Sequence, residues 1–279
     1  MAGHAVIYGA TGTGKNLYKK IVDDYEIVCF IDRNEGLQNT KVFGVEVKNI
    51  DSVDFSDIDF VFIGVLTGWE DAVELFSSKG ISKENIITTY VDLPSRARRE
   101  CIEKIETVFR FKNIVGSVAE LGVYRGDFAK IINEVFMDRK LYLFDTFEGF
   151  PEADINYEKK YGLLMDKVGN LSDTFVEYVL SKMPYKDNCI VCKGYFPDTA
   201  EGIEEKFCFV NIDTDLYSSI LAGLEWFWPR MITGGYIFVH DYFSFSYAGA
   251  KKAVDEFSEK HKVGFIPIGD AFSVAFIKY

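Results

Sequence analysis

The sequence predicts an α/β protein built from two doubly wound, Rossmann-like domains. Apolar strand segments alternate with helical segments along the chain, which is the pattern of parallel sheets with right-handed crossovers. The alternation also starts twice, each time with a strand that runs into a glycine-containing turn. A length of 279 residues is sufficient for two domains. We assign residues 1–93 to the first domain and residues 94–279 to the second.

The first domain is expected to begin with a strand, a glycine-rich turn and a helix. Its predicted strands are 5–8, 26–31, 42–47, 59–66 and 85–88, and its predicted helices are 15–23 and 70–77. Pro94 is followed by a charged helical stretch, which is typical of a connector between domains.

The second domain repeats the pattern and is expected to close with an antiparallel hairpin, 263–268 with 273–277. Residues 147–171 are polar and irregular, and a segment of that length is typical of a functional lid. The predicted strands are 117–121, 140–144, 189–192, 207–212 and 236–239, and the predicted helices are 127–136, 174–183, 218–227 and 249–259. The third strand contains a Cys-x-x-Cys sequence, which we interpret as core packing.

Charge and composition exclude several classes of protein. A net charge of -12 disfavours nucleic acid as a partner. The longest apolar runs are too short to cross a membrane, and five scattered cysteines do not suggest a disulfide framework. Because the N-terminus leads directly into a strand, we expect no signal peptide and a cytoplasmic protein.

Polar residues follow the strands of the second domain at the points where the strands end. In open α/β sheets, ligands bind outside the carboxyl ends of the strands. Glycines after the first of these strands let backbone approach a ligand closely, and Asp145 after the next strand can accept both hydroxyls of a ribose. The pair indicates an adenosyl-type ligand. The strand-end residues are Glu120, Asp145, Gly194, Asp213, His240 and Asp241.

Five motifs in this domain resemble the macrocin O-methyltransferase (TylF-type) family over about residues 100–279. They are Glu120-Leu121-Gly122-Val123-Tyr124-Arg125-Gly126, Phe144-Asp145-Thr146-Phe147-Glu148-Gly149-Phe150, Gly194-Tyr195-Phe196-Pro197-Asp198-Thr199, Asp213-Thr214-Asp215-Leu216-Tyr217 and His240-Asp241-Tyr242.

The resemblance implies a class I methyltransferase sheet and methyl transfer to hydroxyl groups, often on sugars of natural products. It further implies S-adenosylmethionine, a divalent metal that is usually magnesium, a small hydroxylated acceptor and a homo-oligomer. The expected metal ligands are Asp213, His240 and Asp241, although position 240 carries an acid in the family. The expected cofactor-binding residues are Glu120, Gly122, Tyr124, Gly126, Asp145, Thr146, Gly194 and Tyr195.

The residues themselves are compatible with this chemistry. Carboxylates at neighbouring strand ends can share one hard cation, which lowers the pKa of a bound hydroxyl. We assign catalytic roles to Asp213 and to His240, because an imidazole suits a general base and would also favour manganese or another transition metal. The alternative is that His240 only bonds a loop and that Asp213 caps a helix. For Asp215, capping of the following helix is the expected role.

A second nucleotide site is a further hypothesis, at Gly9, Gly12, Gly14 and Asp32. The turn nearly matches a phosphate-binding loop, but Asn16 stands where a serine or threonine is needed. The domain resembles the N-terminal domains of sugar-modifying acyltransferases and of some glycan methyltransferases, which bind nucleotides in some relatives. A purely structural role is an equal alternative.

Two other classes of function remain as alternatives. An NAD-dependent nucleotide-sugar epimerase or reductase would need a Tyr-x-x-x-Lys pair after the fourth strand, and residues 59–90 contain none. A non-catalytic nucleotide-binding protein would not need the acids of the second domain. The acceptor is expected to contact segments 147–171 and 243–248.

Overall fold

The computed structural model describes residues 3–65, 68–163, 167–244 and 246–279. The predicted strand end at Leu66 and parts of the two acceptor segments, residues 164–166 and 245, lie outside the described residues. The chain divides into two compact units, residues 1–96 and 97–279. Among the described residues, no helix is both long and apolar enough to cross a membrane.

Unit 1 contains a six-stranded sheet in the order β3-β4-β2-β1-β5-β6, parallel except for β3. Apolar residues of α1 cover one sheet face, and those of α2 cover the other. The elements are β1 Gly3–Tyr8, α1 Gly12–Ile21, β2 Tyr25–Ile31, β3 Lys41–Val42, β4 Val45–Lys48, β5 Phe60–Ile63, α2 Trp69–Ser78 and β6 Ile86–Ile87.

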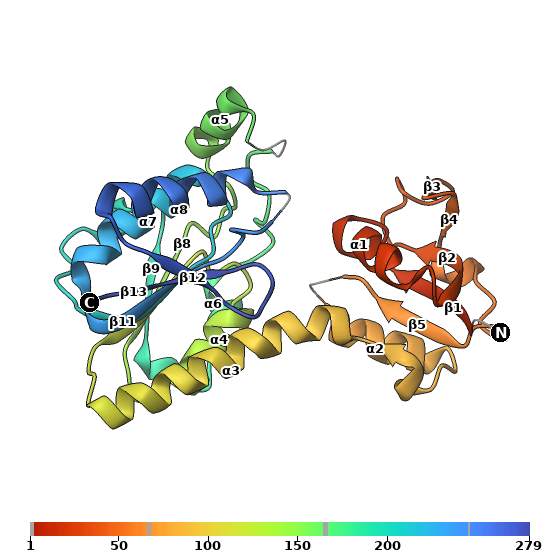
Figure 1. Cartoon of the computed structure of the whole chain (residues 1–279), viewed down its shortest axis with the longest axis horizontal. Helices are drawn as coiled ribbons and strands as arrows, with labels where there is room; N and C mark the ends of the chain where they lie inside the picture. The colour runs from red at the N-terminus through yellow and green to blue at the C-terminus, as the bar shows by residue number, and fades with distance from the viewer. Residues whose placement is uncertain (1–2, 66–67, 164–166, 245) are drawn as a thin grey trace. The chain divides into compact units, whose positions relative to one another are not determined.

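Unit 2 contains a seven-stranded sheet in the order β12-β13-β11-β10-β7-β8-β9, in which β13 pairs antiparallel with both β11 and β12. Two clusters of buried side chains hold helices on its two faces (Figure 1): α7 and α8 on one face, and α3, α4 and α6 on the other. The elements are α3 Thr89–Lys112, β7 Ser117–Leu121, α4 Asp127–Val135, β8 Leu141–Asp145, α5 Glu152–Tyr161, α6 Val176–Lys182, β9 Cys189–Lys193, β10 Phe207–Ile212, α7 Tyr217–Phe227, β11 Met231–Val239, α8 Ala248–His261, β12 Phe265–Pro267 and β13 Val274–Ile277.

The predicted connector after Pro94 is instead the interior of a continuous helix. Helix α3 begins at Thr89, five residues before the proline, and the division between the two units falls inside it. Val91 is buried in a core cluster of unit 1, while Ile102 and Phe109 are buried in unit 2. Burial at both ends explains why the helix persists through a residue that cannot donate a backbone hydrogen bond.

Three other expectations are corrected. The single strand predicted at 42–47 is a hairpin of β3 and β4, turning at Phe43 and Gly44, both of which have positive φ. The segment 147–171 contains helix α5 rather than being irregular throughout. The Cys-x-x-Cys strand, β9, is a half-buried strand at the sheet edge rather than a buried one, and its cysteines are free.

The order of the strands reverses once in each unit. From β7 the chain proceeds to β8 and β9 on one side, and it later returns through β10 and β11 on the other. The reversal lies between β7 and β10, which is where ligands bind in open α/β sheets. In unit 1 the corresponding reversal lies between β1 and β5.

Candidate active site

A pocket in unit 2 lies at this reversal of strand order. Gly122 after β7 and Asp213 after β10 both line it, and so do residues after β8 and β9. The backbones at the reversal are in contact, because a Cβ added to Gly122 would stand 2.1 Å from the carbonyl oxygen of Asp213. Only glycine fits there. The predicted site residues that line the pocket are Gly122, Tyr124, Asp145, Thr146, Gly194, Tyr195 and Asp213.

Two predicted cofactor residues are absent from the lining. Glu120 is 1% exposed, and its Oε1 accepts a hydrogen bond from Asn211 Nδ2 at 2.9 Å. Burial, followed by the negative charge of Asp213, raises the pKa of Glu120. Gly126 is the N-cap of α4, and a Cβ there would stand 2.9 Å from Val179. Its glycine is therefore explained by packing against α6.

Asp145 organises the turn that forms one wall of the pocket. Its Oδ2 accepts hydrogen bonds from the backbone nitrogens of Val123 and Tyr124 at 2.7 and 2.8 Å, and its Oδ1 accepts one from Phe147 at 2.7 Å. These bonds explain why a carboxylate at the end of β8 fixes a turn that follows β7. These three bonds use three of the roughly four acceptor sites of the carboxylate, and the one that remains, on Oδ1, is available to a ribose hydroxyl. The ribose-binding role stays a prediction.

The neighbouring wall, after β9, is held by a buried acid that the sequence did not single out. Tyr195, at the end of β9, donates its hydroxyl to Asp154 Oδ1 at 2.8 Å. Asp154 belongs to α5, is 2% exposed and also accepts a hydrogen bond from Ser219 on α7. Helix α5 is thereby docked onto the pocket through a polar contact.

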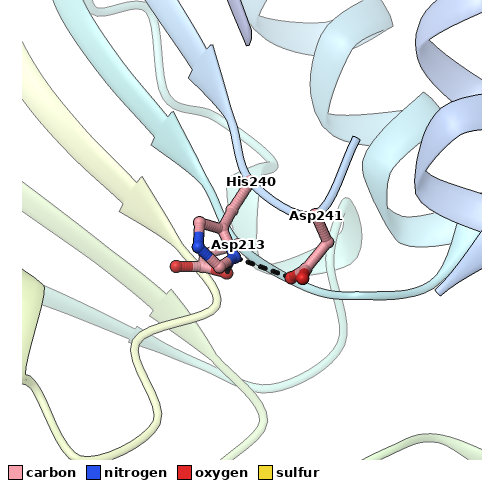
Figure 2. Close-up of side chains that lie close together, drawn as sticks. All are labelled: Asp213, His240 and Asp241. Carbon is pink, nitrogen blue, oxygen red and sulfur yellow. Dashed lines mark hydrogen bonds and ion pairs between the residues drawn. The ribbon is translucent and has the colours of Figure 1, made fainter. Parts of the chain in front are cut away.

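Asp213, His240 and Asp241 lie together beyond the ends of β10 and β11 (Figure 2). His240 Nδ1 is 2.7 Å from Asp241 Oδ2 and 3.1 Å from Asp213 Oδ1. Because an ionised carboxylate can only accept, Nδ1 carries a hydrogen in this arrangement. One ligand atom from each residue lies within 4.8 Å of the others, a spacing that could hold a metal ion.

Opposite charges determine the protonation of this cluster. Burial alone would lower the pKa of His240, but Asp213 and Asp241 outweigh it and raise the pKa to about 10. Burial would raise the pKa of Asp213, but the positive charges of His240 and Arg98 lower it. The cluster without a cation therefore contains an imidazolium between two carboxylates.

Asp215 and Arg98 are site residues that sequence reasoning missed. Asp215 does not cap α7, whose N-cap is Leu216 without a side-chain cap; it lines the pocket with φ 63°. Burial and the adjacent carboxylate of Asp241 raise the pKa of Asp215. Arg98 on α3 contacts Asp213 from 115 residues away along the chain. No local pattern could reveal that contact.

The glycine turn of unit 1 is explained by packing. A Cβ on Gly14 would stand 1.9 Å from the carbonyl oxygen of Gly9, and one on Gly9 would stand 2.7 Å from that of Gly64. Asp32 accepts hydrogen bonds from the backbone nitrogens of Ala10 and Asn34, both at 2.8 Å. A nucleotide site here stays a prediction, and Gly12, with open space around it, is the predicted residue that packing does not require.

Comparison with known proteins agrees with this architecture. The solved structure of the O-methyltransferase NovP aligns with 65% of this chain and 79% of its own, with a TM-score of 0.55 and 23% identity. The fold is thus similar to that of solved methyltransferases. Residues 94–276 match the family model of macrocin-O-methyltransferase (TylF), and residues 1–87 match that of the C2185-like N-terminal domain. The chain belongs to the macrocin-O-methyltransferase (TylF) family.

Two curated relatives carry related names. One is the 8-demethyl-8-(2,3-dimethoxy-alpha-L-rhamnosyl)-tetracenomycin-C 4'-O-methyltransferase of Streptomyces olivaceus, 28% identical over 50% of this chain and 57% of its own. The other is the mycinamicin III 3''-O-methyltransferase of Micromonospora griseorubida, 26% identical over 57% of this chain and 66% of its own. The chain thus spans between about half and two thirds of the length of these relatives.

Proposed function

We propose that this chain transfers a methyl group from S-adenosylmethionine to a hydroxyl group of a sugar-like or other small natural-product acceptor. The observation that carries the proposal is a pocket at the strand reversal that shares Asp213 with a cluster of potential metal ligands. A cofactor and an acceptor bound on the two sides of Asp213 would be held next to each other. Family membership and the names of the two relatives support the reaction class.

The pocket would hold the cofactor. Gly122 lines the pocket at the strand reversal, and Asp145 offers its remaining acceptor site, on Oδ1, to a ribose hydroxyl. Tyr195 and Gly194 form the wall after β9, with the tyrosine ring fixed through its hydroxyl. The positive charge of the sulfonium is compatible with a pocket whose lining includes three aspartates, Asp145, Asp213 and Asp215.

The cluster next to the pocket would hold a divalent cation. Two carboxylates and an imidazole are donor types that suit magnesium, manganese and other divalent metals, so Asp213, His240 and Asp241 fit the group that the family implies. Such a cation would lower the pKa of an acceptor hydroxyl. The chain itself must then orient the hydroxyl towards the methyl group and accept its proton.

Two side chains are candidates for the proton acceptor. His240 accepts a proton only as the neutral imidazole, a form that the carboxylates of Asp213 and Asp241 disfavour. Asp215 lines the pocket beside Asp241 and accepts a proton as the carboxylate. The variants His240→Asp and Asp215→Asn distinguish the two candidates. The proton acceptor is the residue whose replacement changes the pH dependence of the rate.

The test is an assay of methyl transfer to a panel of deoxyhexose glycosides, in which the S-adenosylhomocysteine released is measured. We expect a chelator to abolish transfer while leaving the affinity for S-adenosylmethionine intact, since the sulfonium needs no cation to bind. Asp241→Asn should behave like the chelated enzyme. Asp138→Asn, which changes an exposed acid paired with Arg110, should transfer methyl groups like the wild type.

His240→Asp, which restores the acid of the family, should retain activity and shift the metal preference towards magnesium. Full turnover in excess chelator, with all variants active, would exclude the metal.

A further inference from the structure

Arg98 is a buried cation beside the metal-ligand cluster, on a helix that neither the pocket nor the family motifs include. Its side chain is 9% exposed, and the guanidinium carbon lies 3.8 Å from the centre of the Phe128 ring. A buried guanidinium this close to the face of an aromatic ring has little freedom to move. Packing alone therefore holds Arg98 in place, and its polar contacts add to that restraint.

The guanidinium joins the cluster to a second, fixed acid. Its Nη2 and Nη1 lie 3.3 and 3.5 Å from Asp213 Oδ2, and its Nε lies 3.7 Å from Asp270 Oδ2. Asp270 has a fully buried side chain that accepts hydrogen bonds from the backbone nitrogens of Phe272 and Ser273. Arg98 therefore connects Asp213 to Asp270, whose carboxylate is fixed by hydrogen bonds within the loop before β13.

The two oxygens of Asp213 are divided between two partners. Oδ2 contacts Arg98, and Oδ1 contacts His240 Nδ1 at 3.1 Å, on the side of Asp241. Rotation of the carboxylate would break both contacts together. We propose that Arg98 is a positioning residue that holds Asp213 through Oδ2 and so presents Oδ1 to the divalent cation. This inference rests on the proposed function, because it assigns Arg98 a role toward the metal.

Orientation and charge predict effects of opposite sign. A fixed positive charge near the cluster repels a divalent cation, so removing Arg98 would tighten metal binding if charge decided the outcome. If orientation decides, loss of the residue that holds a ligand weakens binding, and such losses typically cost about 10–100-fold in metal affinity. Lysine separates the two effects, because it keeps the charge but lacks the planar fork.

The experiment measures Mn²⁺ affinity by calorimetry on the full chain, without any acceptor. We expect Arg98→Lys and Arg98→Met each to weaken Mn²⁺ binding about tenfold or more. Arg99→Met is the matched control, because Arg99 is the next residue of α3, is 41% exposed and pairs with Glu103 and Glu134 instead. Its Mn²⁺ affinity should equal that of the wild type. Affinity for S-adenosylhomocysteine should be unchanged in all three variants, since Arg98 does not line the pocket.

Arg98→Met leaves Asp270 buried without its cation, so the double variant Arg98→Met/Asp270→Asn repeats the measurement without that unpaired charge. Wild-type affinity in Arg98→Lys, or tighter binding in Arg98→Met, would overturn the positioning role. Equal loss of Mn²⁺ and S-adenosylhomocysteine binding would overturn it as well, because it would indicate general damage. A wild-type protein that binds no Mn²⁺ would refute both the metal in the proposed function and the role of Arg98. If the wild type binds Mn²⁺ and the Arg98 variants bind it equally well, only the role of Arg98 is refuted.

Discussion

Asp145 shows how one side chain can serve both the fold and the proposed cofactor site. It accepts two backbone hydrogen bonds from the turn after β7 and a third from Phe147 after β8, and it lines the pocket where the ribose is expected. Asp145→Asn keeps one acceptor oxygen and the shape of the side chain but removes the charge. A hydrogen bond to a charged group contributes about 1.5–3 kcal/mol, so we expect S-adenosylhomocysteine to bind Asp145→Asn at least about tenfold more weakly.

Asp145→Ala is the comparison that separates the two roles. It leaves the backbone nitrogens of Val123, Tyr124 and Phe147 without their acceptor, and each unpaired buried group costs about 1–3 kcal/mol. In Asp145→Asn the amide nitrogen replaces one acceptor oxygen, so at least one of these backbone nitrogens also loses its partner. We therefore expect the melting temperature to fall in both variants, and further in the alanine variant. Calorimetry and thermal denaturation measure the two effects separately. An unchanged dissociation constant in Asp145→Asn would show that the carboxylate serves the turn alone.

At the residue scale, the sequence predicts side chains that share a strand end and misses those brought in by packing. Asp213, His240 and Asp241 follow β10 and β11 directly, so the rule for strand ends is sufficient to predict that they lie together. Arg98 reaches the same cluster from a helix, where one arginine among several charged residues carries no distinguishing signal. The sequence around Asp215 favours helix capping, since an aspartate stands just before a helical segment. The left-handed backbone of Asp215, which places it beside Asp241, leaves no sign in the sequence.

At the element scale, helix α5 buries two acids, Asp154 and Glu158, beside the apolar Ile155. Glu158 is 1% exposed, and its Oε1 accepts a hydrogen bond from the first backbone nitrogen of α7, Tyr217, at 2.6 Å. Gly249 of α8 leaves the space for this carboxylate, since a Cβ there would stand 2.6 Å from Oε1. A helix N-terminus favours a negative charge, and here the charge comes from a neighbouring helix.

This arrangement predicts a pH-dependent contribution of Glu158 to stability. Burial raises the pKa of Glu158, and the bond from Tyr217 and the charge of Lys252 offset it only in part. A raised carboxyl pKa contributes stability below the ordinary pKa of glutamate, about 4.5, and that contribution is lost as the pH rises through the folded value. We expect Glu158→Gln, which keeps the acceptor oxygen, to gain in melting temperature relative to the wild type as the pH rises from 4 to 8.

The matched variant Glu158→Ala removes the acceptor and leaves the nitrogen of Tyr217 unpaired, so it should be less stable than the wild type by about 1–3 kcal/mol near pH 4. This difference should become smaller as the pH rises, because only the wild type loses the contribution of Glu158. Thermal denaturation of the three proteins across this range decides the matter. A difference between Glu158→Gln and the wild type that does not vary with pH would mean that Glu158 does not titrate in this range.

The same helix explains where sequence reasoning fails for elements. Strands of unit 2 such as β7, β8 and β10 are fully or mostly buried, and their apolar runs reveal them. Two of the three buried residues of helix α5, Asp154 and Glu158, are acids, so the segment lacks the apolar periodicity of an amphipathic helix and resembles a loop in sequence. Pro94 predicts a break in the segment that forms α3, because a proline normally ends a helix, whereas burial on both sides of it keeps the helix intact here.

At the scale of the whole molecule, each unit has its own sheet and its own buried clusters. The clusters of unit 1 and of unit 2 contain no common residue, and every residue that lines the proposed cofactor pocket belongs to residues 97–279. The two family matches divide the chain in a similar place, at residues 1–87 and 94–276. Among the described residues, the lining of the proposed cofactor pocket therefore comes from unit 2.

A chain of residues 89–279 should therefore fold alone and bind S-adenosylhomocysteine with the affinity of the full protein. It starts at Thr89 because a start at residue 97 would place Arg98 in the first helical turn, where four backbone nitrogens lack partners and the helix frays. A shorter chain starting at Glu103 loses Arg98 and the buried Ile102, so we expect it to melt at a lower temperature and to lose Mn²⁺ binding while still binding S-adenosylhomocysteine. Circular dichroism establishes folding, and calorimetry measures both ligands. If residues 89–279 are well folded yet bind no S-adenosylhomocysteine, while the full chain does, the cofactor site depends on unit 1 and the assignment of the pocket to unit 2 alone is wrong.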